Sequence, residues 1–415
     1  MRRRLRAGKI GAMGRRDAEG AGEAGDPRSK SLISKPVVSL ALAMMASAFG
    51  FQMLLSVVPL YAAAVGGGTG GAGLATATFM LTTVLAQVAM PKLLGRFGYR
   101  RVLVAGLCFL GLPALLYPLA GGVAGVLAVT LLRGVGFGII TVGFAALIVE
   151  LAPPERRGEA LGLFGMAMTL PTIFSNPLGL WLVDASGYTT VFFLGGLLPL
   201  LALFALAGIS TGSLEREDVG SAGFLEGLRR GPLLRLVLIF ATVTSATGVV
   251  VTFLPLAVPA SGLFSPASAL LVFGLTSTFS RLWAGRFGDR RDPHLLLAPG
   301  LVATAGGMVA LPQGGPPTLV GALLLGAGVG LLQNSTLILI MDRVADDERG
   351  LGSTLWNVSF DAGTGVGAFS FGFLVGVTGL PSAFYISALI LLAAIALVFV
   401  DHRHKKPAPH HPAEY

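Results

Sequence analysis

The sequence predicts an all-α membrane protein with twelve transmembrane helices in two pseudo-symmetric six-helix bundles. Three observations predict it. Only 12% of the 415 residues are charged and the mean hydropathy is +0.78, whereas soluble domains carry about 25% charged residues. Twelve apolar runs are each long enough to cross about 30 Å of hydrocarbon as a helix. Finally, one pattern of glycines and charges occurs twice, 192 residues apart.

The twelve runs are expected to be helices because lipid offers no partners to backbone N–H and C=O groups. The predicted spans are roughly 36–62, 74–94, 101–120, 123–150, 159–183, 189–209, 235–257, 267–285, 295–312, 317–341, 351–376 and 381–400.

These spans divide the chain into five parts. Residues 1–35 are expected to be a disordered basic arm, and residues 401–415 a disordered tail, both cytoplasmic. The two six-helix bundles take residues 36–209 and 235–400, joined by the polar cytoplasmic linker 210–234.

Basic residues indicate the orientation. The connections after spans 1, 3, 5, 7, 9 and 11 contain no Lys or Arg, so the positive-inside rule places both termini in the cytoplasm. We expect a multi-pass protein of the plasma membrane. The net charge of +9 is then concentrated on the cytoplasmic face, where it favours membrane lipids rather than nucleic acid as partners. The single cysteine, Cys108, excludes disulfides within the chain, and neither a metal site nor a cofactor is expected.

The internal repeat is clearest in span 4. "LLRGVGFGI" at 131–139 aligns with "LLLGAGVGL" at 323–331, and the register continues without a gap for 25 residues. The matched pairs are Gly134 with Gly326, Gly136 with Gly328, Gly138 with Gly330, Glu150 with Asp342, Arg157 with Arg349, and Gly158 with Gly350. Two parallel six-helix repeats, with a binding site near the midplane between them, are an architecture of secondary transporters.

Similar charged sequence motifs follow predicted spans 2 and 8 and extend this repeat. "GRFGDRR" at 285–291 supplies Gly285, Asp289 and Arg290 of a Gly-x-x-x-Asp-Arg-x-Gly pattern. Asp292 occupies the position of the second glycine of that pattern. In the first half "GRFGYRR" at 95–101 contributes Arg96 and Gly98, but Gly95 stands at the aspartate position, 194 residues before Asp289. On these motifs the chain resembles the major facilitator superfamily, and the resemblance covers about residues 36–400.

That resemblance implies a gating motif. In the family this cluster acts as a latch between the halves that breaks during alternating access, and here it would comprise Gly285, Asp289 and Arg290, with Gly95, Arg96 and Gly98 as a weakened counterpart. The alternative is that the arginines only anchor the topology. "SNPLGLWL" at 175–182 also resembles the span-5 motif of exporters in this family, although Asn176 replaces its glycine.

Two ionisable residues are expected deep in the membrane. Arg133 on span 4 and Asp361 on span 11 each lie about 15 Å from a surface, where a charge is costly and usually marks a pathway. The repeat-related positions in the other half hold Leu325 and Thr169. Neither charge is therefore part of the structure that the two halves share. We expect Asp361 to carry a coupling proton, with Arg133 tuning it or binding an anionic group of the substrate. The alternatives are a hydrogen-bonded acceptor at a helix contact for Asp361 and a structural ion pair for Arg133.

Other polar residues in the spans are candidates for substrate binding. They are Gln52 on span 1, Gln333 and Asn334 on span 10, and Trp356 and Asn357 on span 11. Each is equally able to form hydrogen bonds between helices.

The expected function is secondary active transport by alternating access, namely proton-antiport efflux of small organic molecules by a monomer. No Gly-x-x-x-x-Gly-Lys-Ser/Thr loop is present, so ATP is not expected to drive transport directly. All five histidines fall in predicted cytoplasmic segments, which excludes a histidine-based nucleophile triad in the membrane, and no enzyme activity is expected. The alternatives are a proton symporter or uniporter that imports a small solute, or a transporter-like membrane receptor that transports nothing.

Overall fold

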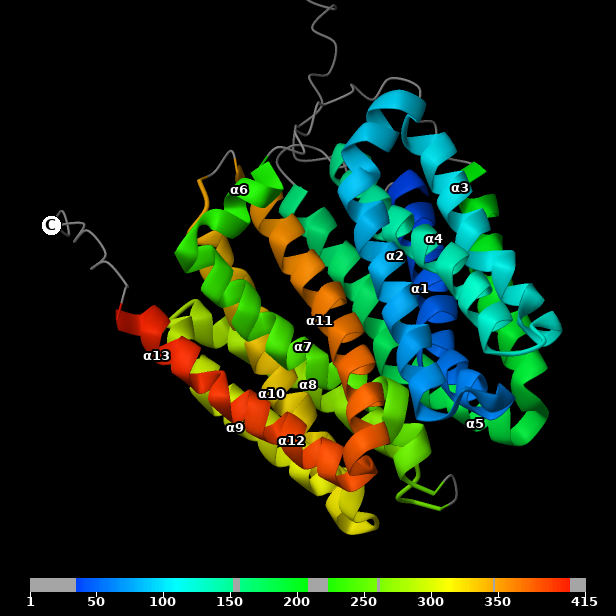
Figure 1. The fold of residues 1–415 in the computed structure, drawn as a ribbon. Coiled ribbons are helices and arrows are strands. Elements are labelled where there is room, and N and C mark those ends of the chain that lie inside the picture. Colours follow the sequence, from blue (N-terminus) through cyan, green and yellow to red (C-terminus); the bar gives the residue numbers. More distant parts are fainter. Residues whose placement is uncertain (1–34, 152–156, 208–222, 260–261, 346–347, 404–415) are drawn as a thin grey trace, which may run out of the picture.

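The computed structural model describes residues 35–151, 157–207, 223–259, 262–345 and 348–403 (Figure 1). Within these ranges the chain forms helices and no strand. The predicted terminal arm and tail lie outside the described residues, apart from Lys35 and residues 401–403, which are helical. The same holds for residues 208–222, which comprise the last two residues of the predicted N-terminal bundle and the first part of the predicted linker.

The N-terminal helices correspond to predicted spans 1 to 6. They are α1 (Lys35–Ala62), η2 (Ala63–Gly67), α2 (Gly68–Phe97), α3 (Tyr99–Gly111), η3 (Pro113–Leu119), α4 (Val123–Leu151) and α5 (Arg157–Ala207).

The C-terminal helices correspond to predicted spans 7 to 12. They are α6 (Gly223–Arg229), α7 (Gly231–Ala257), α8 (Pro266–Gly288), η5 (Pro293–Leu296), α9 (Leu297–Ala310), η6 (Leu311–Gln313), α10 (Pro316–Met341), α11 (Arg349–Thr378), α12 (Leu380–Ala393) and α13 (Ile395–Arg403). The end of the predicted linker is therefore helical, as α6 and the start of α7.

The helices are long and apolar enough for a multi-pass membrane protein. In the described ranges nine segments meet that requirement, and two of them, of 61 and 41 residues, each overlap two predicted spans. The first is interrupted at Val65 and Gly66, and the second at Gly187. Gly187 has φ +81°, a conformation that a residue with a Cβ rarely adopts, so glycine permits this break. Helix α8 is not among the nine, because its serines, threonines and Arg281 lower its hydropathy.

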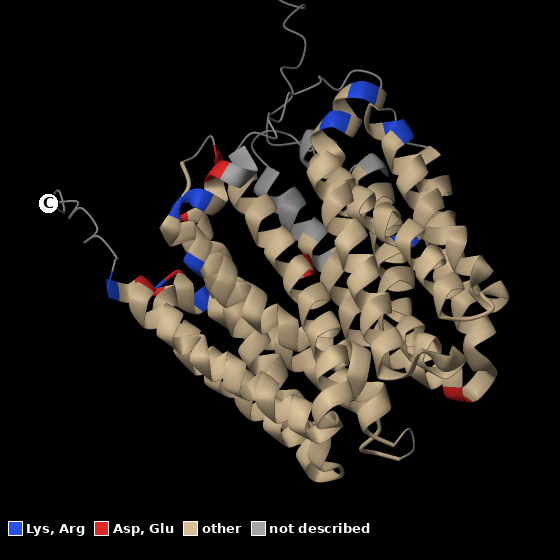
Figure 2. Cartoon of the chain, in the orientation of Figure 1, with Lys and Arg blue, Asp and Glu red and all other residues tan. Residues whose placement is uncertain are grey.

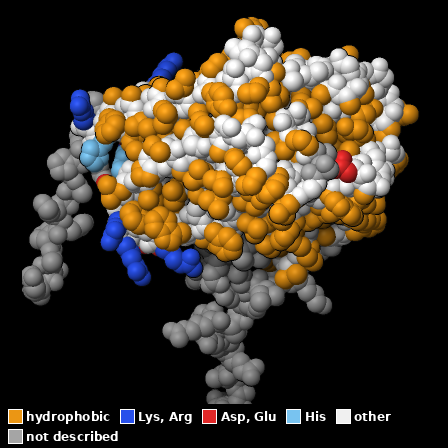
Figure 3. All heavy atoms as spheres, turned by 90° about the horizontal axis from the view of Figure 1, so that it is seen from below, with side chains coloured by type: hydrophobic (Ala, Val, Ile, Leu, Met, Phe, Trp, Pro, Cys, Tyr) orange, Lys and Arg blue, Asp and Glu red, His pale blue; other side chains and the backbone are white. Residues whose placement is uncertain are grey.

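The outer surface is apolar, as expected for contact with lipid. Large side chains such as Phe204, Phe373 and Leu81 are 61% to 78% exposed, and hydrophobic side chains cover much of the face seen in Figure 3. Basic residues of the described ranges gather toward one end of the helices (Figure 2). This distribution is that of a bundle surrounded by hydrocarbon with one positively charged end.

The repeated glycines make equivalent contacts. A Cβ on Gly134 of α4 would strike the carbonyl oxygen of Phe79 on α2, and a Cβ on Gly326 of α10 would lie 2.6 Å from that of Phe273 on α8. These glycines are 192 residues apart, and their partners 194. Likewise Gly136 approaches the Gly106 carbonyl on α3, and Gly328 that of Gly300 on α9. Glycine is needed here because the helix backbones themselves touch.

The N-terminal helices (α1–α5) meet the C-terminal helices (α7–α13) mainly along two contacts, α2 with α11 and α5 with α8, which we call the seam; α7 makes smaller contacts with α1 and α2. A Cβ on Gly365 of α11 would lie 2.8 Å from the Cβ of Met80 on α2. At the other contact a Cβ on Gly274 of α8 would lie 3.0 Å from the Cα of Ile173 on α5. Met80 and Gly274 are 194 residues apart, and Ile173 and Gly365 are 192 apart. The two contacts are therefore related by the repeat.

Candidate functional site

Asp361 lies in the seam. Its side chain is buried, and its Oδ2 accepts a hydrogen bond from Nε2 of Gln87 on α2, at 2.7 Å. Gln87 is also buried, and its own Oε1 has no hydrogen-bond partner among the described residues. The only side-chain hydrogen bond of Asp361 within the described ranges therefore comes from the other side of the seam. Sequence reasoning found Asp361 but missed Gln87.

Close helix packing explains the glycine-rich segment after Asp361. A Cβ on Gly363 would lie 2.5 Å from the Ala241 carbonyl oxygen on α7, and one on Gly367 would lie 2.5 Å from the Cα of Ser245. In the opposite direction, Gly248 of α7 faces the backbone of Thr364. Because α7 and α11 touch through their backbones, α11 is held at a defined distance and presents Asp361 to α2.

Arg133 has a different environment. Its side chain is buried, donating from Nη1 to the Tyr117 hydroxyl at 3.2 Å and from Nε to the Leu110 carbonyl at 3.4 Å, while Nη2 has no partner among the described residues. Its Cζ lies 5.6 Å from the centre of the Phe79 ring and 5.5 Å from that of Tyr117. Arg133 thus contacts α3 and η3 within the N-terminal helices, and the structure does not pair it with Asp361.

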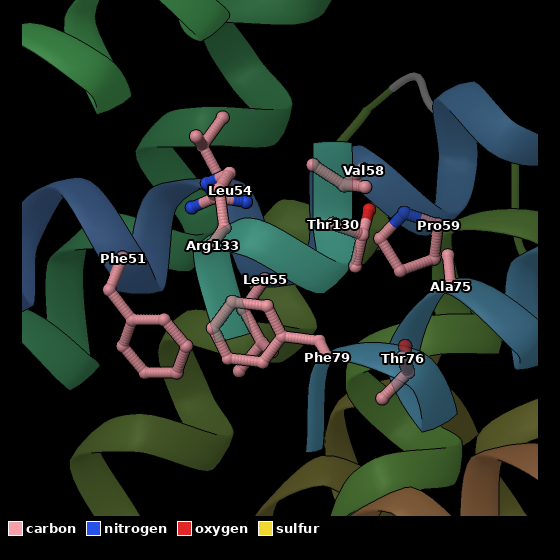
Figure 4. A pocket seen from close by; sticks show the side chains of 10 residues that line it. All are labelled: Phe51, Leu54, Leu55, Val58, Pro59, Ala75, Thr76, Phe79, Thr130 and Arg133. Atoms are coloured by element: carbon pink, nitrogen blue, oxygen red, sulfur yellow. The ribbon is translucent and has the colours of Figure 1, made fainter. Parts of the chain in front are cut away.

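A small cavity adjoins Arg133 (Figure 4). Its lining residues come from α1, α2 and α4: Phe51, Leu54, Leu55, Val58, Pro59, Ala75, Thr76, Phe79, Thr130 and Arg133. Its volume of about 10 Å³ suits about one water molecule, whereas pockets for small organic molecules occupy roughly 300–1,000 Å³. In this conformation the cavity is too small for an organic solute.

Gln52 forms part of a polar contact between α1 and α5. Its Nε2 donates to the Thr172 hydroxyl at 2.9 Å, and its Oε1 accepts from Nδ2 of Asn176 at 3.3 Å. Ser56 donates to Oδ1 of the same asparagine at 3.1 Å. These contacts are of the kind that holds membrane helices together, so in this conformation both ends of the Gln52 amide are occupied within the protein.

The predicted polar residues of spans 10 and 11 gather around a residue that the sequence analysis did not single out, Arg281 of α8. Asn334 donates from Nδ2 to the Arg281 carbonyl at 2.9 Å, and Trp356 donates from Nε1 to the Gln333 carbonyl at 3.2 Å. The Cζ of Arg281 lies 5.7 Å from the centre of the Trp356 ring. Asn357 instead bonds within α11, to the Ser353 carbonyl. The sequence feature that could have identified Arg281 is its position inside predicted span 267–285, where an arginine is uncommon.

The predicted gating residues lie at the ends of α2 and α8. Gly285 allows Asn334 of α10 to approach, since a Cβ there would lie 2.7 Å from its Nδ2. Asp289 and Arg290 are exposed, and within the described residues Asp289 makes no ion pair. Arg290 borders a hollow of about 340 Å³ with Trp283, Arg286, Phe287 and Arg291. The latch is thus not closed between described residues in this conformation, and it stays a prediction.

The counterpart at the end of α2 is a tight turn. Gly98 has φ +74°, which lets α2 end and α3 begin at the next residue. The guanidinium of Arg96 lies 5.2 Å from the ring of Phe97, and a Cβ on Gly95 would meet no atom within 4 Å. An aspartate at Gly95 would therefore fit, so packing does not require glycine there.

A charged cluster at the ends of α7, α10 and α13 was not predicted. The buried carboxylate of Asp401 accepts from Nε of Arg235 at 2.9 Å and from both terminal nitrogens of Arg343, at 3.0 and 2.7 Å. His294 is also buried, with Nε2 3.5 Å from Oδ2 of Asp401. The cluster ties the end of the last described helix to α7 and α10.

A second ion pair joins the start of α7 to the start of α11. Arg230 donates from Nη1 and Nη2 to the two oxygens of Glu348, each at 2.7 Å. These hydrogen bonds hold the pKa of Glu348 below its usual range. Sequence reasoning missed this pair because its members are 118 residues apart.

Comparison with known proteins gives the family. The profile of the Major Facilitator Superfamily matches residues 40–344 and 267–414, and thus most of the chain. The chain belongs to the Major Facilitator Superfamily. It is accordingly a multi-pass membrane transporter protein and not an enzyme, as the sequence analysis predicted.

Relatives within the superfamily include efflux proteins. An uncharacterized MFS-type transporter of Methanocaldococcus jannaschii is 24% identical over 370 residues, covering 86% of this chain and 95% of the relative. A multi-drug resistance efflux pump PmrA homolog of Lactococcus lactis is 27% identical, over 69% of this chain and 74% of the relative. A probable sugar efflux transporter of Mannheimia succiniciproducens is 25% identical, over 61% and 65%.

Solved structures of other transporters share the fold. A bacterial homolog of the human lysosomal transporter Spinster superposes with a TM-score of 0.74 at 14% identity, covering 90% of this chain and 98% of that one. A POT family transporter in complex with a thioalcohol-conjugated peptide gives 0.74 at 12% identity, over 89% and 96%. At these identities the likeness concerns the fold alone.

Proposed function

We propose that the protein is a twelve-helix secondary active transporter that exports small organic molecules in exchange for protons. The two halves are residues 36–209 and 235–400, and a solute crosses where they meet. The repeat-related contacts of Met80 with Gly365 and of Gly274 with Ile173 support a pseudo-twofold arrangement. The multi-drug efflux pump homolog and the probable sugar efflux transporter support export.

The observation that carries the proposal is the Gln87–Asp361 hydrogen bond across the seam. A carboxylate in the membrane interior is costly, and here no cation pairs with it in the described ranges. Any movement that separates α2 from α11 changes both the solvation and the hydrogen bonding of Asp361. Protonation of Asp361 and opening of the seam are therefore linked, as proton coupling requires.

Gln87 is able to form a hydrogen bond with Asp361 in both protonation states of the carboxyl group. Its amide Nε2 donates to the ionised carboxylate. Its Oε1, which lacks a partner in the described part of the chain, is able to accept from the protonated carboxyl if the amide rotates. A glutamine can thus keep one hydrogen bond with Asp361 before and after proton transfer, whereas an arginine would stabilise only the ionised form.

The test uses everted membrane vesicles with an acidic interior, a pH-sensitive dye and a broad panel of organic compounds. For the wild type, adding a transported compound releases protons from the vesicles. Asp361→Asn is expected to abolish this release and to retain exchange of the same compound without a pH gradient. Asp184→Asn, at an exposed position, is the matched control. Full proton release by Asp361→Asn would refute the carrier role, and solute entry into intact cells without an alkaline shift would favour facilitated import.

The remaining features of the proposal are topology, gating and partners. We place both termini in the cytoplasm, because the basic residues gather toward one end of the helices. We also propose that the protein is a monomer in the plasma membrane. A reporter fused near residue 220 should then be cytoplasmic. Gly285, Asp289 and Arg290 act as a gate at that surface, where basic side chains contact anionic membrane lipids.

A further inference from the structure

Arg281 is a cation with no counter-charge among the described side chains. It lies in α8, seven residues before the last residue of the helix, and its side chain is half-buried. Its backbone is held against α10, since its carbonyl accepts from Asn334 and a Cβ on Gly330 would lie 2.9 Å from its amide nitrogen. Its guanidinium, in contrast, makes no hydrogen bond or ion pair with the side chains and backbone groups that the structure describes.

The other half-buried arginines of the C-terminal helices are all paired with a carboxylate in the described part of the chain. Arg235 and Arg343 share the carboxylate of Asp401, and Arg230 binds Glu348 through two hydrogen bonds. Those three lie at or beyond the ends of predicted spans, whereas Arg281 lies four residues inside predicted span 267–285. An unpaired cation is more costly there than in water.

An aromatic surface adjoins this cation. The ring of Trp356, 5.7 Å from the Cζ of Arg281, stacks on Phe240 at 5.0 Å and lies 6.3 Å from Phe360. The indole N–H is fixed by the Gln333 carbonyl. The side chains of Arg281, Trp356 and Phe360 are all half-buried, so part of each remains accessible.

Comparison of the two repeats shows that the unpaired charge on α8 has no equivalent on α2. Arg281 occupies the position in α8 that Gln87 occupies in α2, 194 residues earlier. Gln87 faces Asp361 on α11, whose counterpart on α5 is Thr169. Thr169 is neutral, and its hydroxyl donates to the Gly165 carbonyl. At this repeat position α2 therefore has an amide that binds a carboxylate, and α8 has a guanidinium beside Trp356 with no carboxylate among the described side chains.

We propose that Arg281 binds an anionic group of the transported solute, and that the apolar part of the solute packs against Trp356 and Phe360. A guanidinium presents parallel N–H donors that match a carboxylate or sulfonate. The substrate class is thus the amphipathic organic anions. Asp361 does not compete for Arg281, because its described hydrogen bond goes to Gln87. This inference rests on the proposed transport function and specifies its solute.

The experiment measures binding to the purified full-length protein by tryptophan fluorescence. The chain has three tryptophans, so Trp181→Phe and Trp283→Phe, at two exposed positions, leave Trp356 as the only reporter. The probes are 4-phenylbutyrate, its neutral amide and 4-phenylbutylamine, which differ mainly in charge. We expect the carboxylate to bind at least about tenfold more tightly than the amide, and the amine most weakly, as a charge-assisted hydrogen bond predicts.

Substitutions of two arginines of α8 test whether the charge of Arg281 causes the preference for the carboxylate. Arg281→Gln should remove the preference for the carboxylate while the amide binds as before, which also shows that the variant is folded. Arg281→Lys should keep a reduced preference, because lysine retains the charge but not the paired donors. Arg286→Gln, at an exposed position of the same helix, is the control and should behave as the reporter protein does.

Equal binding of the carboxylate and the amide by the reporter protein would overturn the inference, and this comparison requires no change at Arg281. A preference that survives Arg281→Gln, or one that is lost in Arg286→Gln, would also overturn it. Binding is measured at equilibrium without a pH gradient. A failure here therefore leaves proton coupling through Asp361 intact, and a failure of the vesicle experiment leaves the binding result intact.

Discussion

Gly73 offers a direct test of whether α2 and α11 separate during the transport cycle. A Cβ on Gly73 would lie 2.6 Å from the Ala368 carbonyl oxygen and 3.3 Å from the Cα of Gly372, both on α11. Ordinary van der Waals contact begins at about 3.4 Å. Both obstacles are backbone atoms, so no rotamer change can relieve the contact. Gly73→Val is therefore expected to destabilise the conformation in which these helices touch.

The magnitude follows from the cost of overpacking. Extra carbon atoms in a well-packed interior cost about 1–3 kcal/mol. A conformation in which this end of the seam is open does not incur that cost. Since about 1.4 kcal/mol corresponds to a factor of ten, the ratio of open to closed molecules should rise by roughly 5- to 150-fold.

Thiol labelling measures this ratio. Thr76 is 2% exposed and bonds to Thr252 of α7 at 2.7 Å, so a reagent reaches position 76 only when this end opens. With Cys108→Ser to remove the only natural thiol, Thr76→Cys is labelled in the purified protein by a hydrophilic maleimide. Gly73→Val should raise the labelling rate by the factor given above, because the rate follows the open population.

The control is Gly70→Val, in the same helix three residues earlier. A Cβ there would meet no atom within 4 Å, so the labelling rate should stay near that of the parent protein. Equal rates in the two valine variants would refute the reasoning, because they would mean that the Gly73–Ala368 approach does not limit opening.

Two further predictions concern the ion pairs. Arg230 holds the pKa of Glu348 low, so the pair stabilises the fold above the ordinary glutamate value of about 4.3 and ceases to do so as the pH falls through the lowered value. Thermal unfolding should show a small advantage of the wild type over Glu348→Gln at pH 7 that disappears at a pH well below 4; an advantage that grows in acid would contradict the assignment. Asp401→Asn leaves Arg235 and Arg343 without their shared carboxylate and should cost about 3 kcal/mol of stability, visible as a lower midpoint of thermal unfolding than that of Asp184→Asn. Equal midpoints would show that the cluster contributes nothing.

Local features of the sequence were sufficient for the helices and for the family. Hydropathy and span length depend only on neighbouring residues, so the apolar runs predicted the helices, with shifts of a few residues such as the start of α7 at Gly231. The glycines at 134, 136, 326 and 328 also predicted the repeat-related packing, because only glycine permits backbones to touch.

Contacts between distant residues were decided by the tertiary structure alone. Asp361 was recognisable as a buried carboxylate, but its partner Gln87 lies 274 residues away, beyond the reach of any local pattern. Arg133 and Arg281 both lie inside predicted spans. Helix packing alone directs Arg133 toward Tyr117 and leaves Arg281 beside Trp356, with no counter-charge among the described side chains. The sequence thus determined which segments enter the membrane, because transfer to lipid depends on composition. The packing of those segments determined which buried charges are satisfied, because that depends on where each side chain points.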